Sequence, residues 1–347
     1  MGRKFFQTLL NSGCWYGCGS NSFGELGLGD DVNRTGLAPI GSFDLLLPGC
    51  YHVLARQGQQ LVVWGANNVG QLGLNDSETR FSPQYTSRNL FPLGAANSSF
   101  TRDSSGAVYA WGYNAQGQLG LGDTVNRFSP VQINLAVTQI WAGLYLTAAR
   151  DNQGNFYVSG YNHNGELGLG DYNNRNKFTY ANNILWQAVA IGQYHTLALN
   201  ATNKLYAWGY NASGQLGMSD TTSRANYALV NQKVWQQVYA CDNHSLALDA
   251  DGYLWGWGDN STGQLGLGDT AWRWTPIRIS NKKWRTAATG RYHSVAIDEE
   301  GCLWAWGSNA KGQLGLGNAG TQLYPVKVDN YRYIEVKCSH ESTFAKR

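Results

Sequence analysis

The segment Tyr109-Ala-Trp-Gly-Tyr-Asn-Ala-Gln-Gly-Gln-Leu-Gly-Leu-Gly-Asp123 decides the fold of this chain, because the same pattern returns along its whole length. Its centre is Gly-x-Leu-Gly, in which x is Gln or Glu. The first glycines of the seven copies are 46 to 49 residues apart, and they are Gly24, Gly70, Gly117, Gly165, Gly214, Gly263 and Gly312. A fixed period of this length indicates a repeat protein, in which each unit buries its apolar faces against its neighbours.

Other residue types stand at constant distances from each copy. Six copies have Asp and Arg six and ten residues after the first glycine, and the seventh has Asn318 and Gln322. Five copies have a Trp-Gly pair upstream, and Cys18 and Ser159 replace the Trp in the other two. A Gly-x-x-His strand precedes that pair, and we assign to its histidine position His52, His195, His244, His293 and His340, with Ser98 and Leu146 in the two remaining copies. Each period therefore repeats several strands and not only one loop.

The length of one period and the composition together predict the fold class. Each period has room for about four short strands, which is the content of one propeller blade. Aromatic residues make up 13% of the chain and there are 43 glycines, whereas charged residues are only 14%; strands favour aromatic side chains and tight corners favour glycine. No segment has a sustained period of 3.6 residues, so we expect almost no helix. The sequence predicts an all-β, seven-bladed β-propeller of four-stranded antiparallel blades, as a single domain over residues 1–347.

Closing the ring requires the two ends of the chain to meet. We expect the last strands, near Tyr333–Lys337 and Glu341–Lys346, to lie beside a strand at Cys14–Gly19. The segment Phe5–Leu10 also matches the histidine-bearing strand, which gives eight candidates for seven places. The sequence leaves open which terminal segment completes the ring.

Charge and apolar runs limit the classes of partner. The net charge is +3, and no block or tail of basic residues occurs, so we expect no nucleic acid as a partner. No apolar run has the length of a signal peptide or of a membrane span. We therefore predict no membrane insertion, and a location in the cytoplasm or within a particle such as a virion.

The six cysteines are too few for a disulfide framework in a chain of 347 residues, and we expect free thiols. Cys14 and Cys18 lie four residues apart on a predicted strand, roughly 13 Å, which exceeds the ~7 Å Cα separation that a disulfide tolerates. Cys50 and Cys338 fall in equivalent positions of adjacent blades when His340 is taken as the repeat histidine.

The quoted segment and His244-Ser-Leu-Ala-Leu-Asp249 resemble the repeat of the regulator of chromosome condensation family, over about residues 13–345. The resemblance implies a seven-bladed propeller. It does not select a function, because members include a guanine-nucleotide exchange factor for a small nuclear GTPase, a plant ultraviolet-B photoreceptor, modules of ubiquitin ligases and a bacterial inhibitor of β-lactamases.

Two of these members can be compared with the residues of this chain. The photoreceptor has Trp and Arg at the two positions before the repeat histidine, whereas those positions here read Cys50-Tyr51, Gln193-Tyr194, Asp242-Asn243 and Arg291-Tyr292. The resemblance therefore does not extend to photoreception. The nuclear exchange factor typically carries a basic tail, and this sequence shows none.

The polar repeat positions favour a structural role over a catalytic one. Histidines on successive blades, without a carboxylate or cysteine at ligand spacing, are not typical of a metal site. We interpret them as half-buried side chains that bond neighbouring backbone. We interpret the Asp and Arg positions as loop-stabilising pairs, because a catalytic pair is needed once and not six times. We expect no enzymatic activity, no catalytic residue, no cofactor and no metal.

Function is expected where the repeat is broken. Strand direction alternates, so the Gly-x-x-His turns and the Gly-x-Leu-Gly loops emerge on one face of the disc. Tyr, Trp and Arg anchor protein interfaces, and the partner-binding residues predicted on that face are Tyr51, Tyr145, Tyr194, Tyr292, Trp272, Arg273 and Trp274. The alternative is that these rings only cover the blade edges.

The resulting functional prediction is a non-enzymatic interaction scaffold. Its partner would be another protein or an assembly subunit, and its role that of a structural or attachment component of a larger assembly, such as a phage or virus virion. The support is compositional: low charge, many Asn, Gln and Gly residues, and many aromatic rings. The alternative is a regulatory propeller, either a guanine-nucleotide exchange factor for a small GTPase or a protein inhibitor of a partner enzyme.

Overall fold

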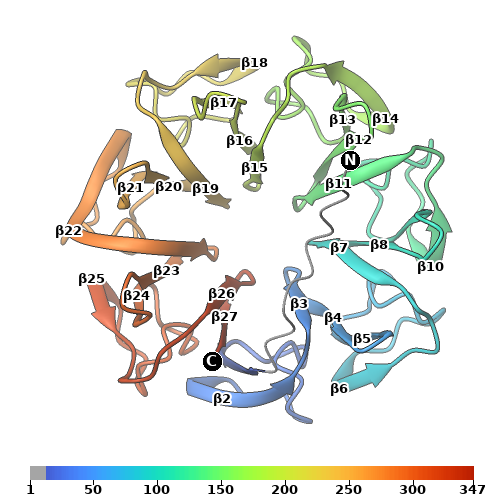
Figure 1. The fold of residues 1–347 in the computed structure, drawn as a ribbon, viewed down its shortest axis with the longest axis horizontal. Helices are drawn as coiled ribbons and strands as arrows, with labels where there is room; N and C mark the ends of the chain where they lie inside the picture. The colour runs from blue at the N-terminus through green and yellow to red at the C-terminus, as the bar shows by residue number, and fades with distance from the viewer. Residues whose placement is uncertain (1–12) are drawn as a thin grey trace, which may run out of the picture.

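The computed structural model describes residues 13–347, and this part of the chain contains 27 strands and no helix. The strands form six hydrogen-bonded sheets, five of four strands and one of seven. The seven-stranded sheet contains two blades that share one strand, so the disc has seven blades around a central axis (Figure 1). The predicted all-β propeller is confirmed.

Blades 1 to 4 each consist of four consecutive antiparallel strands, from the axis outwards. Blade 1 comprises β3 (Leu45–Pro48), β4 (His52–Gln57), β5 (Gln60–Gly65) and β6 (Arg80–Tyr85). Blade 2 comprises β7 (Phe91–Ala95), β8 (Ser98–Arg102), β9 (Val108–Gly112) and β10 (Arg127–Gln132). Blade 3 comprises β11 (Val137–Ala142), β12 (Leu146–Asp151), β13 (Phe156–Gly160) and β14 (Arg175–Asn182), and blade 4 comprises β15 (Ala188–Ile191), β16 (His195–Leu199), β17 (Leu205–Gly209) and β18 (Arg224–Leu229).

Blades 5 and 6 are joined by one continuous strand of 17 residues, β22 (Arg273–Thr289). Its first part is the outer strand of blade 5 and its last part is the inner strand of blade 6, where it bends around the edge of the disc (Figure 1). The remaining strands are β19 (Trp235–Cys241), β20 (His244–Asp249) and β21 (Tyr253–Gly258) in blade 5, and β23 (His293–Asp298), β24 (Leu303–Gly307) and β25 (Gln322–Lys327) in blade 6.

Blade 7 closes the ring with strands from both ends of the described chain. Its order is β2-β1-β27-β26, from β2 (Arg34–Ser42) and β1 (Cys14–Gly19) on one side to β27 (Ser342–Lys346) and β26 (Glu335–Cys338) on the other. Tyr16 pairs with Ala345 in this junction, as expected from the sequence. The candidate strand Phe5–Leu10 lies outside the described residues.

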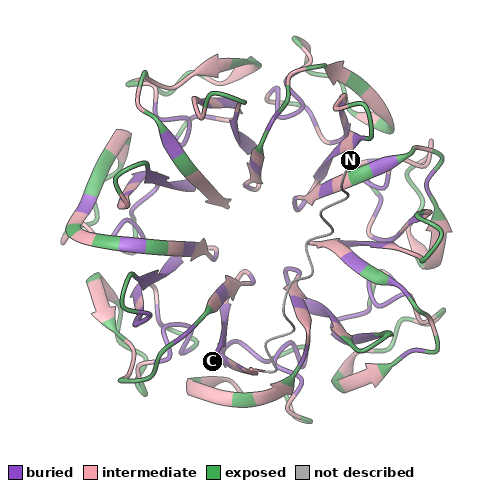
Figure 2. Ribbon diagram, viewed as in Figure 1, coloured by how far each residue is buried: buried purple, intermediate pink, exposed green. Residues whose placement is uncertain are grey.

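The core lies between the blades, where one hydrogen-bonding pattern is repeated. In the blade pair 4 and 5, the backbone carbonyl of Gln215, the x residue of Gly-x-Leu-Gly, accepts 2.8 Å bonds from Trp257 Nε1 and from Ser245 Oγ of the next blade. The Trp-Gly tryptophans Trp64, Trp111, Trp208 and Trp306 donate in the same way to Glu25, Gln71, Glu166 and Gln264. These five rings are buried between neighbouring blades. In Figure 2 the middle strands of the blades are mostly drawn in the colour of buried residues.

The two copies without a tryptophan keep the donor. Ser159 Oγ donates to the carbonyl of Gln118 at 3.2 Å, and Cys18 Sγ lies 3.5 Å from the carbonyl of Gln313. The second glycine of the motif is needed for this close approach. At Gly217, where φ is +73°, a Cβ atom would lie 2.8 Å from Trp257 Nε1. All seven blade junctions therefore use the same acceptor.

The repeat histidines are buried completely and bond a side chain, not the backbone that we predicted. Nε2 of His52, His195, His244 and His293 lies 2.8 to 3.1 Å from a hydroxyl oxygen of the next blade, in Ser99, Ser245, Ser294 and Thr343. Each of these hydroxyls donates to the x carbonyl. Burial lowers the pKa of the four histidines to about 3. Their rings are therefore neutral at pH 7 and link neighbouring blades by hydrogen bonds.

The assignment of His340 to this position is wrong. In blade 7 the residue opposite Gly19 is Ser342, just as His52 stands opposite Gly65 in blade 1. His340 is two residues earlier, at the tip of the hairpin, and its counterpart in blade 1 is Cys50. Cys50 and Cys338 are therefore not equivalent positions.

The Asp and Arg positions form loop clasps, as interpreted from the sequence. Arg224 Nη2 and Asp220 Oδ2 are 2.7 Å apart, and the same pair recurs in the five other copies that have both residues. A buried asparagine that the sequence analysis overlooked completes each clasp. In this loop, Asn211 Nδ2 donates to the carbonyl of Asp220 at 3.0 Å, and its Oδ1 accepts from Leu216 N at 2.9 Å.

The inter-blade bond predicts the outcome of a matched pair of substitutions. Trp257→Phe removes ring volume and the bond to Gln215, whereas Trp186→Phe removes ring volume only, because Trp186 Nε1 has no hydrogen-bond partner. We expect Trp257→Phe to lower the free energy of unfolding by about 1 kcal/mol more than Trp186→Phe, the net value of one hydrogen bond. Urea denaturation measures both, and equal losses would contradict this role of the indole nitrogen.

The buried histidines predict a loss of stability in mild acid. The unfolded chain takes up a proton on each imidazole near pH 6.5, and the folded chain does so only near pH 3. Between these values the unfolded state binds more protons, so stability falls as pH falls, by about 1.4 kcal/mol per pH unit for each histidine. Denaturation at pH 7.5 to 5 measures the slope.

His195→Gln should reduce the slope of stability against pH by the contribution of one histidine, because one imidazole fewer takes up a proton on unfolding. Ser245→Ala, which removes the hydroxyl partner and keeps the imidazole, should lower stability at every pH and keep the slope. An unchanged slope in His195→Gln would show that this imidazole is not buried in its neutral form.

Candidate protein-interaction face

The predicted tyrosines lie at the tips of the innermost hairpins, on the same face as the Gly-x-Leu-Gly loops. The carbonyl of Tyr194, for example, accepts a 2.7 Å bond from Tyr210 N, the residue after the Trp-Gly pair of the same blade. Corresponding bonds join Tyr145 to Tyr161 and Tyr292 to Ser308. The hairpin tips and the starts of the long loops are thus locked together on one face.

Two of the four predicted tyrosines are in direct contact. Tyr145 of blade 3 and Tyr194 of blade 4 stack with ring centroids 5.6 Å apart and an angle of 23°. Tyr161 lies against both, at 6.3 and 5.5 Å. Tyr113 of blade 2 extends the row at one end, 6.4 Å from Tyr145, and Tyr210 extends it at the other, 6.3 Å from Tyr194. We call these five residues the tyrosine arc.

Tyr113, Tyr161 and Tyr210 were not in the predicted set. All three directly follow the Trp-Gly pair (Cys-Gly or Ser-Gly in two copies), where the other blades have Ser20, Ala66, Asp259 and Ser308. That departure from the repeat was visible in the sequence. The sequence did not show that the position after the Trp-Gly pair lies beside the position before the histidine. Tyrosines at these two positions therefore make one continuous patch over blades 2 to 4.

The rings of the arc are half-buried, and His163 is exposed beside them, with its ring 4.6 Å from that of Tyr161. Burial, with the neighbouring Tyr145 and Tyr161, raises the pKa of Tyr194 to about 12. The phenol of Tyr194 is therefore neutral near pH 7. Each tyrosine of the arc offers a ring face together with a hydroxyl that can donate or accept a hydrogen bond. A half-buried aromatic patch of this kind suits a protein partner.

Tyr51 and Tyr292 lie apart from the arc. The Tyr51 ring contacts Phe23 and His340, with centroids 5.3 and 5.5 Å away. Arg291 lies over the ring of Tyr292 at 4.9 Å, and its Nε is 3.3 Å from Asp242 Oδ2. These residues belong to blades 5, 6, 7 and 1, on the other side of the channel mouth.

Trp272, Arg273 and Trp274 lie at the same end of the blade, but at the start of its outermost strand, which begins at Arg273. Arg273 pairs with Gly258, which pairs in turn with His244. Arg273 is held by Asp269 at 2.6 Å, as in the other loop clasps. Trp274 packs on the Gly214 loop of blade 4, the place that Phe81 and Phe128 occupy in blades 1 and 2, so part of its role is structural.

Trp272 and Trp274 are 49% and 51% exposed. Within residues 13–347, no ring contact joins either of them to a tyrosine of the arc. The structure thus separates the predicted set into three places: the arc, the opposite side of the channel mouth, and the outer edge.

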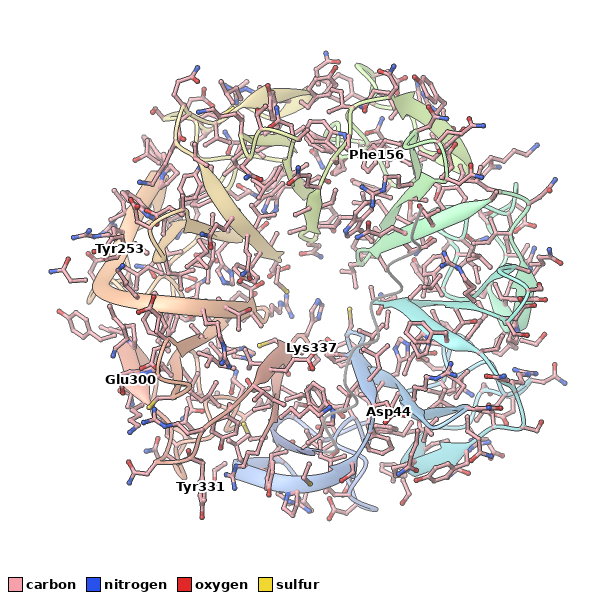
Figure 3. All side chains as sticks on the ribbon, viewed as in Figure 1. Asp44, Phe156, Tyr253, Glu300, Tyr331 and Lys337 are labelled. Carbon is pink, nitrogen blue, oxygen red and sulfur yellow. The ribbon has the colours of Figure 1, made fainter. Side chains whose placement is uncertain are left out.

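One further group resembles a metal site in composition. Asp298, Glu300 and Cys302 bring their ligand atoms within 4.8 Å of one another. Two positively charged side chains already contact these ligand atoms. Arg332 Nη1 lies 2.7 Å from Cys302 Sγ and 3.7 Å from Glu300 Oε2. Lys282 Nζ lies 3.3 Å from Asp298 Oδ2. Glu300 is on the circumference, far from the channel (Figure 3). We interpret this group as an ion-pair cluster, because Lys282 and Arg332 already contact its ligand atoms.

The inner strands surround a channel, whose wall includes Lys337 of β26 (Figure 3). Lys337 Nζ donates to the carbonyl of Leu46 at 2.8 Å and pairs with Glu335 at 3.0 Å, and burial lowers its pKa. The wall is otherwise mostly aliphatic in its middle part, with Leu93, Ile140 and Val238. At the face that carries the tyrosines, the wall becomes polar.

A search for membrane-crossing segments among residues 13–347 found no helix with the length and apolar character that crossing requires.

Comparison with solved structures places this ring among known propellers. Yeast RCC1 (Prp20), in its crystal structure with Kap60, is 21% identical, with a TM-score of 0.85 over 100% of this chain and 94% of that one. Prp20p from Saccharomyces cerevisiae, described with its binding to Gsp1p and histones, is 23% identical, with a TM-score of 0.85 over 96% and 91%. Human WBSCR16 is 20% identical, with the same score over 96% and 99%. At such identities these likenesses establish the fold.

Comparison with protein families gives a direct match. The regulator of chromosome condensation (RCC1) repeat matches residues 105–150, 203–248, 251–297 and 300–345, and a second description of the same repeat matches 186–215, 235–264 and 285–313. These segments cover more than half of the sequence. Each of the four longer ones contains the outer two strands of one blade and the inner two strands of the next blade. The chain belongs to the regulator of chromosome condensation (RCC1) repeat family.

Proposed function

We propose that this chain is a non-enzymatic interaction propeller, whose tyrosine arc docks another protein. The observation that carries the proposal is the arc itself, a continuous row of five half-buried rings over three blades. Three of its members, Tyr113, Tyr161 and Tyr210, stand where the other blades have small or polar residues. Tyrosine supplies large contact area with few rotatable bonds, so little entropy is lost when a partner orders it.

The solved relatives support a protein as the partner. Yeast RCC1 (Prp20) was crystallised with Kap60, and the description of Prp20p names its binding to Gsp1p and histones. Those partners belong to those proteins. What carries over to the proposal is the class of partner, which is another protein.

The polar groups favour binding over catalysis. The four repeat histidines are buried and bonded between blades, and the acidic and basic loop positions are paired with each other. Neither set offers a general base to a substrate, which must approach within hydrogen-bond reach.

A virion or other particle as the larger assembly stays a prediction from composition. A regulatory role on a small GTPase is the second candidate because of the likeness to RCC1.

Site-specific cross-linking from the arc tests the proposal. A photoreactive phenylalanine analogue at position 194 of the full chain, expressed in its native source, should cross-link one protein, identified by mass spectrometry. The same analogue at position 85, a tyrosine that is 54% exposed on the outer strand β6, is the matched control and should not give that product. Equal products from both positions would contradict docking at the arc.

Substitution separates docking from folding. Tyr145→Ala with Tyr194→Ala should weaken binding of the identified partner by at least tenfold, because two central anchors are lost. Tyr85→Ala should leave the affinity unchanged. A large fall in melting temperature with binding intact would assign the arc to the fold instead.

The identity of the partner decides between the roles. A small GTPase whose nucleotide release is accelerated by the chain would establish the regulatory role. A particle subunit present in fixed ratio with the chain would establish the structural one.

A further inference from the structure

The face that carries the tyrosine arc is acidic, although the whole chain has a positive net charge. The face consists of the seven hairpin tips, the seven Gly-x-Leu-Gly loops and the first residue of each outer strand, where the clasp arginines stand. These segments contain 13 Asp and Glu residues and 8 Lys and Arg residues, a net charge of −5, whereas the chain as a whole has +3. An excess of negative charge on one face favours a positively charged partner.

Most of this excess is not balanced by ion pairs. The six clasps contribute no net charge, because each joins one Asp to one Arg. Glu78 and Asp242 also form ion pairs with arginines of this face. Within residues 13–347, the other five carboxylates of the face pair with no Lys or Arg, and they are Glu25, Asp31, Glu166, Asp259 and Glu341.

Two of these five carboxylates belong to residues beside the tyrosine arc. The backbone of Glu166 lies under it, since a Cβ atom at Gly209 would be 3.3 Å from Glu166 Cα and 2.6 Å from the carbonyl oxygen of Tyr194. Asp259 stands on blade 5 at the repeat position that Tyr210 occupies on blade 4. Its Oδ1 accepts a backbone N–H of its own loop at 2.8 Å. In repeat order, the row of rings is therefore followed by a carboxylate.

The rings of the arc have no cation from the chain itself. Elsewhere Arg and Lys side chains lie over aromatic rings, with Arg347 3.7 Å from the ring centroid of Tyr331 and Lys233 4.3 Å from that of Trp255. In the part of the chain that the structure describes, no Lys or Arg lies over a ring of the arc. A tyrosine face attracts a cation electrostatically, so these rings can accept one from a partner.

We propose that the tyrosine arc docks an arginine-bearing segment of its protein partner, with guanidinium groups over the ring faces and an ion pair to Asp259. Arginine suits both places, because its planar guanidinium stacks on aromatic rings and forms two parallel hydrogen bonds with a carboxylate. Lysine carries a compact, strongly hydrated charge that matches neither geometry as well. This inference rests on the proposed docking at the arc and adds the chemistry of the partner.

The test measures binding of a labelled decapeptide of alternating Arg and Gly to the full chain by fluorescence anisotropy. Binding should saturate at one site, and it should weaken at least threefold when NaCl is raised from about 50 to about 200 mM, because salt screens ion pairs. Tyr145→Leu with Tyr194→Leu should weaken binding at least tenfold. Tyr145→Phe with Tyr194→Phe keeps the ring faces and should lose less affinity than the Leu pair.

A matched pair of aspartate substitutions tests the ion pair. Asp259→Asn removes the charge, keeps an acceptor oxygen for the loop, and should weaken binding at least threefold. Asp251→Asn makes the same change in the same blade, in the turn between β20 and β21 at the opposite face, and should leave the affinity unchanged. The melting temperature of each variant reports its folding. If the tyrosine variants do not fold, the two aspartate variants decide.

The outcomes separate this inference from the proposed function. No saturable binding, equal affinity of Asp259→Asn and Asp251→Asn, or equal binding of a decapeptide of alternating Glu and Gly would overturn the arginine-bearing segment. A protein cross-linked at position 194 would in that case keep docking at the arc, with a partner of other chemistry. The absence of any cross-linked protein would overturn the proposed function itself.

Discussion

The bond from each blade to the Gly-x-Leu-Gly carbonyl of the preceding blade is the constraint on which the ring depends. The carbonyl is buried, so it needs a donor, and an unpaired one would cost about 1–3 kcal/mol. Tryptophan supplies the donor and the ring that fills the space between blades. Where Ser159 and Cys18 replace tryptophan, the donor atom remains although the ring is lost. A hydrogen bond to this carbonyl is therefore kept at all seven junctions, whereas the volume of the donor side chain differs between junctions.

This arrangement leaves the hairpin tips free to vary. At the tips it is the backbone that joins neighbouring blades, for example from Cys50 N to the carbonyl of Ala96 at 2.9 Å. The indole-to-carbonyl bond comes from the strands and the long loops, so it does not fix the tip side chains. The tips accordingly differ from blade to blade, with Cys50, Gln193, Asp242, Arg291 and His340 at one equivalent position. Loops held by a rigid scaffold are where binding residues concentrate. The tyrosine arc lies at these tips and at the adjoining starts of the long loops, which is why one face of the disc carries the candidate site.

The sequence predicts the blade number, the shared face of turns and loops, and the Asp–Arg clasps, because each follows from period and strand alternation alone. It does not place His340. His340 and Ser342 are two positions apart, and side chains two apart on a strand point to the same side, so the alternation fits either assignment. Hydrogen bonding decides: Ser342 stands opposite Gly19, whereas His340 turns into the channel.

The arc shows a second limit of the sequence. Tyr194 and Tyr210 belong to different repeat positions, 16 residues apart in the printed sequence, and Tyr145 belongs to another blade. Their contact depends on how the hairpin tip meets the start of the long loop, which no single period encodes. Departures from a repeat can be read from the sequence. Which departures lie together is set by the three-dimensional register of neighbouring blades.

Closure of the ring and contact between the hairpin tips are physically coupled. Cys50 and His340 are 290 residues apart in the chain and become neighbours only when blade 7 is assembled from both ends. A ligand that binds only the closed ring stabilises it by mass action, by about 2.7 kcal/mol at a hundred times its dissociation constant. Because the rings of the tyrosine arc come from three blades, a partner docked on them would also favour the assembled ring over the unfolded chain.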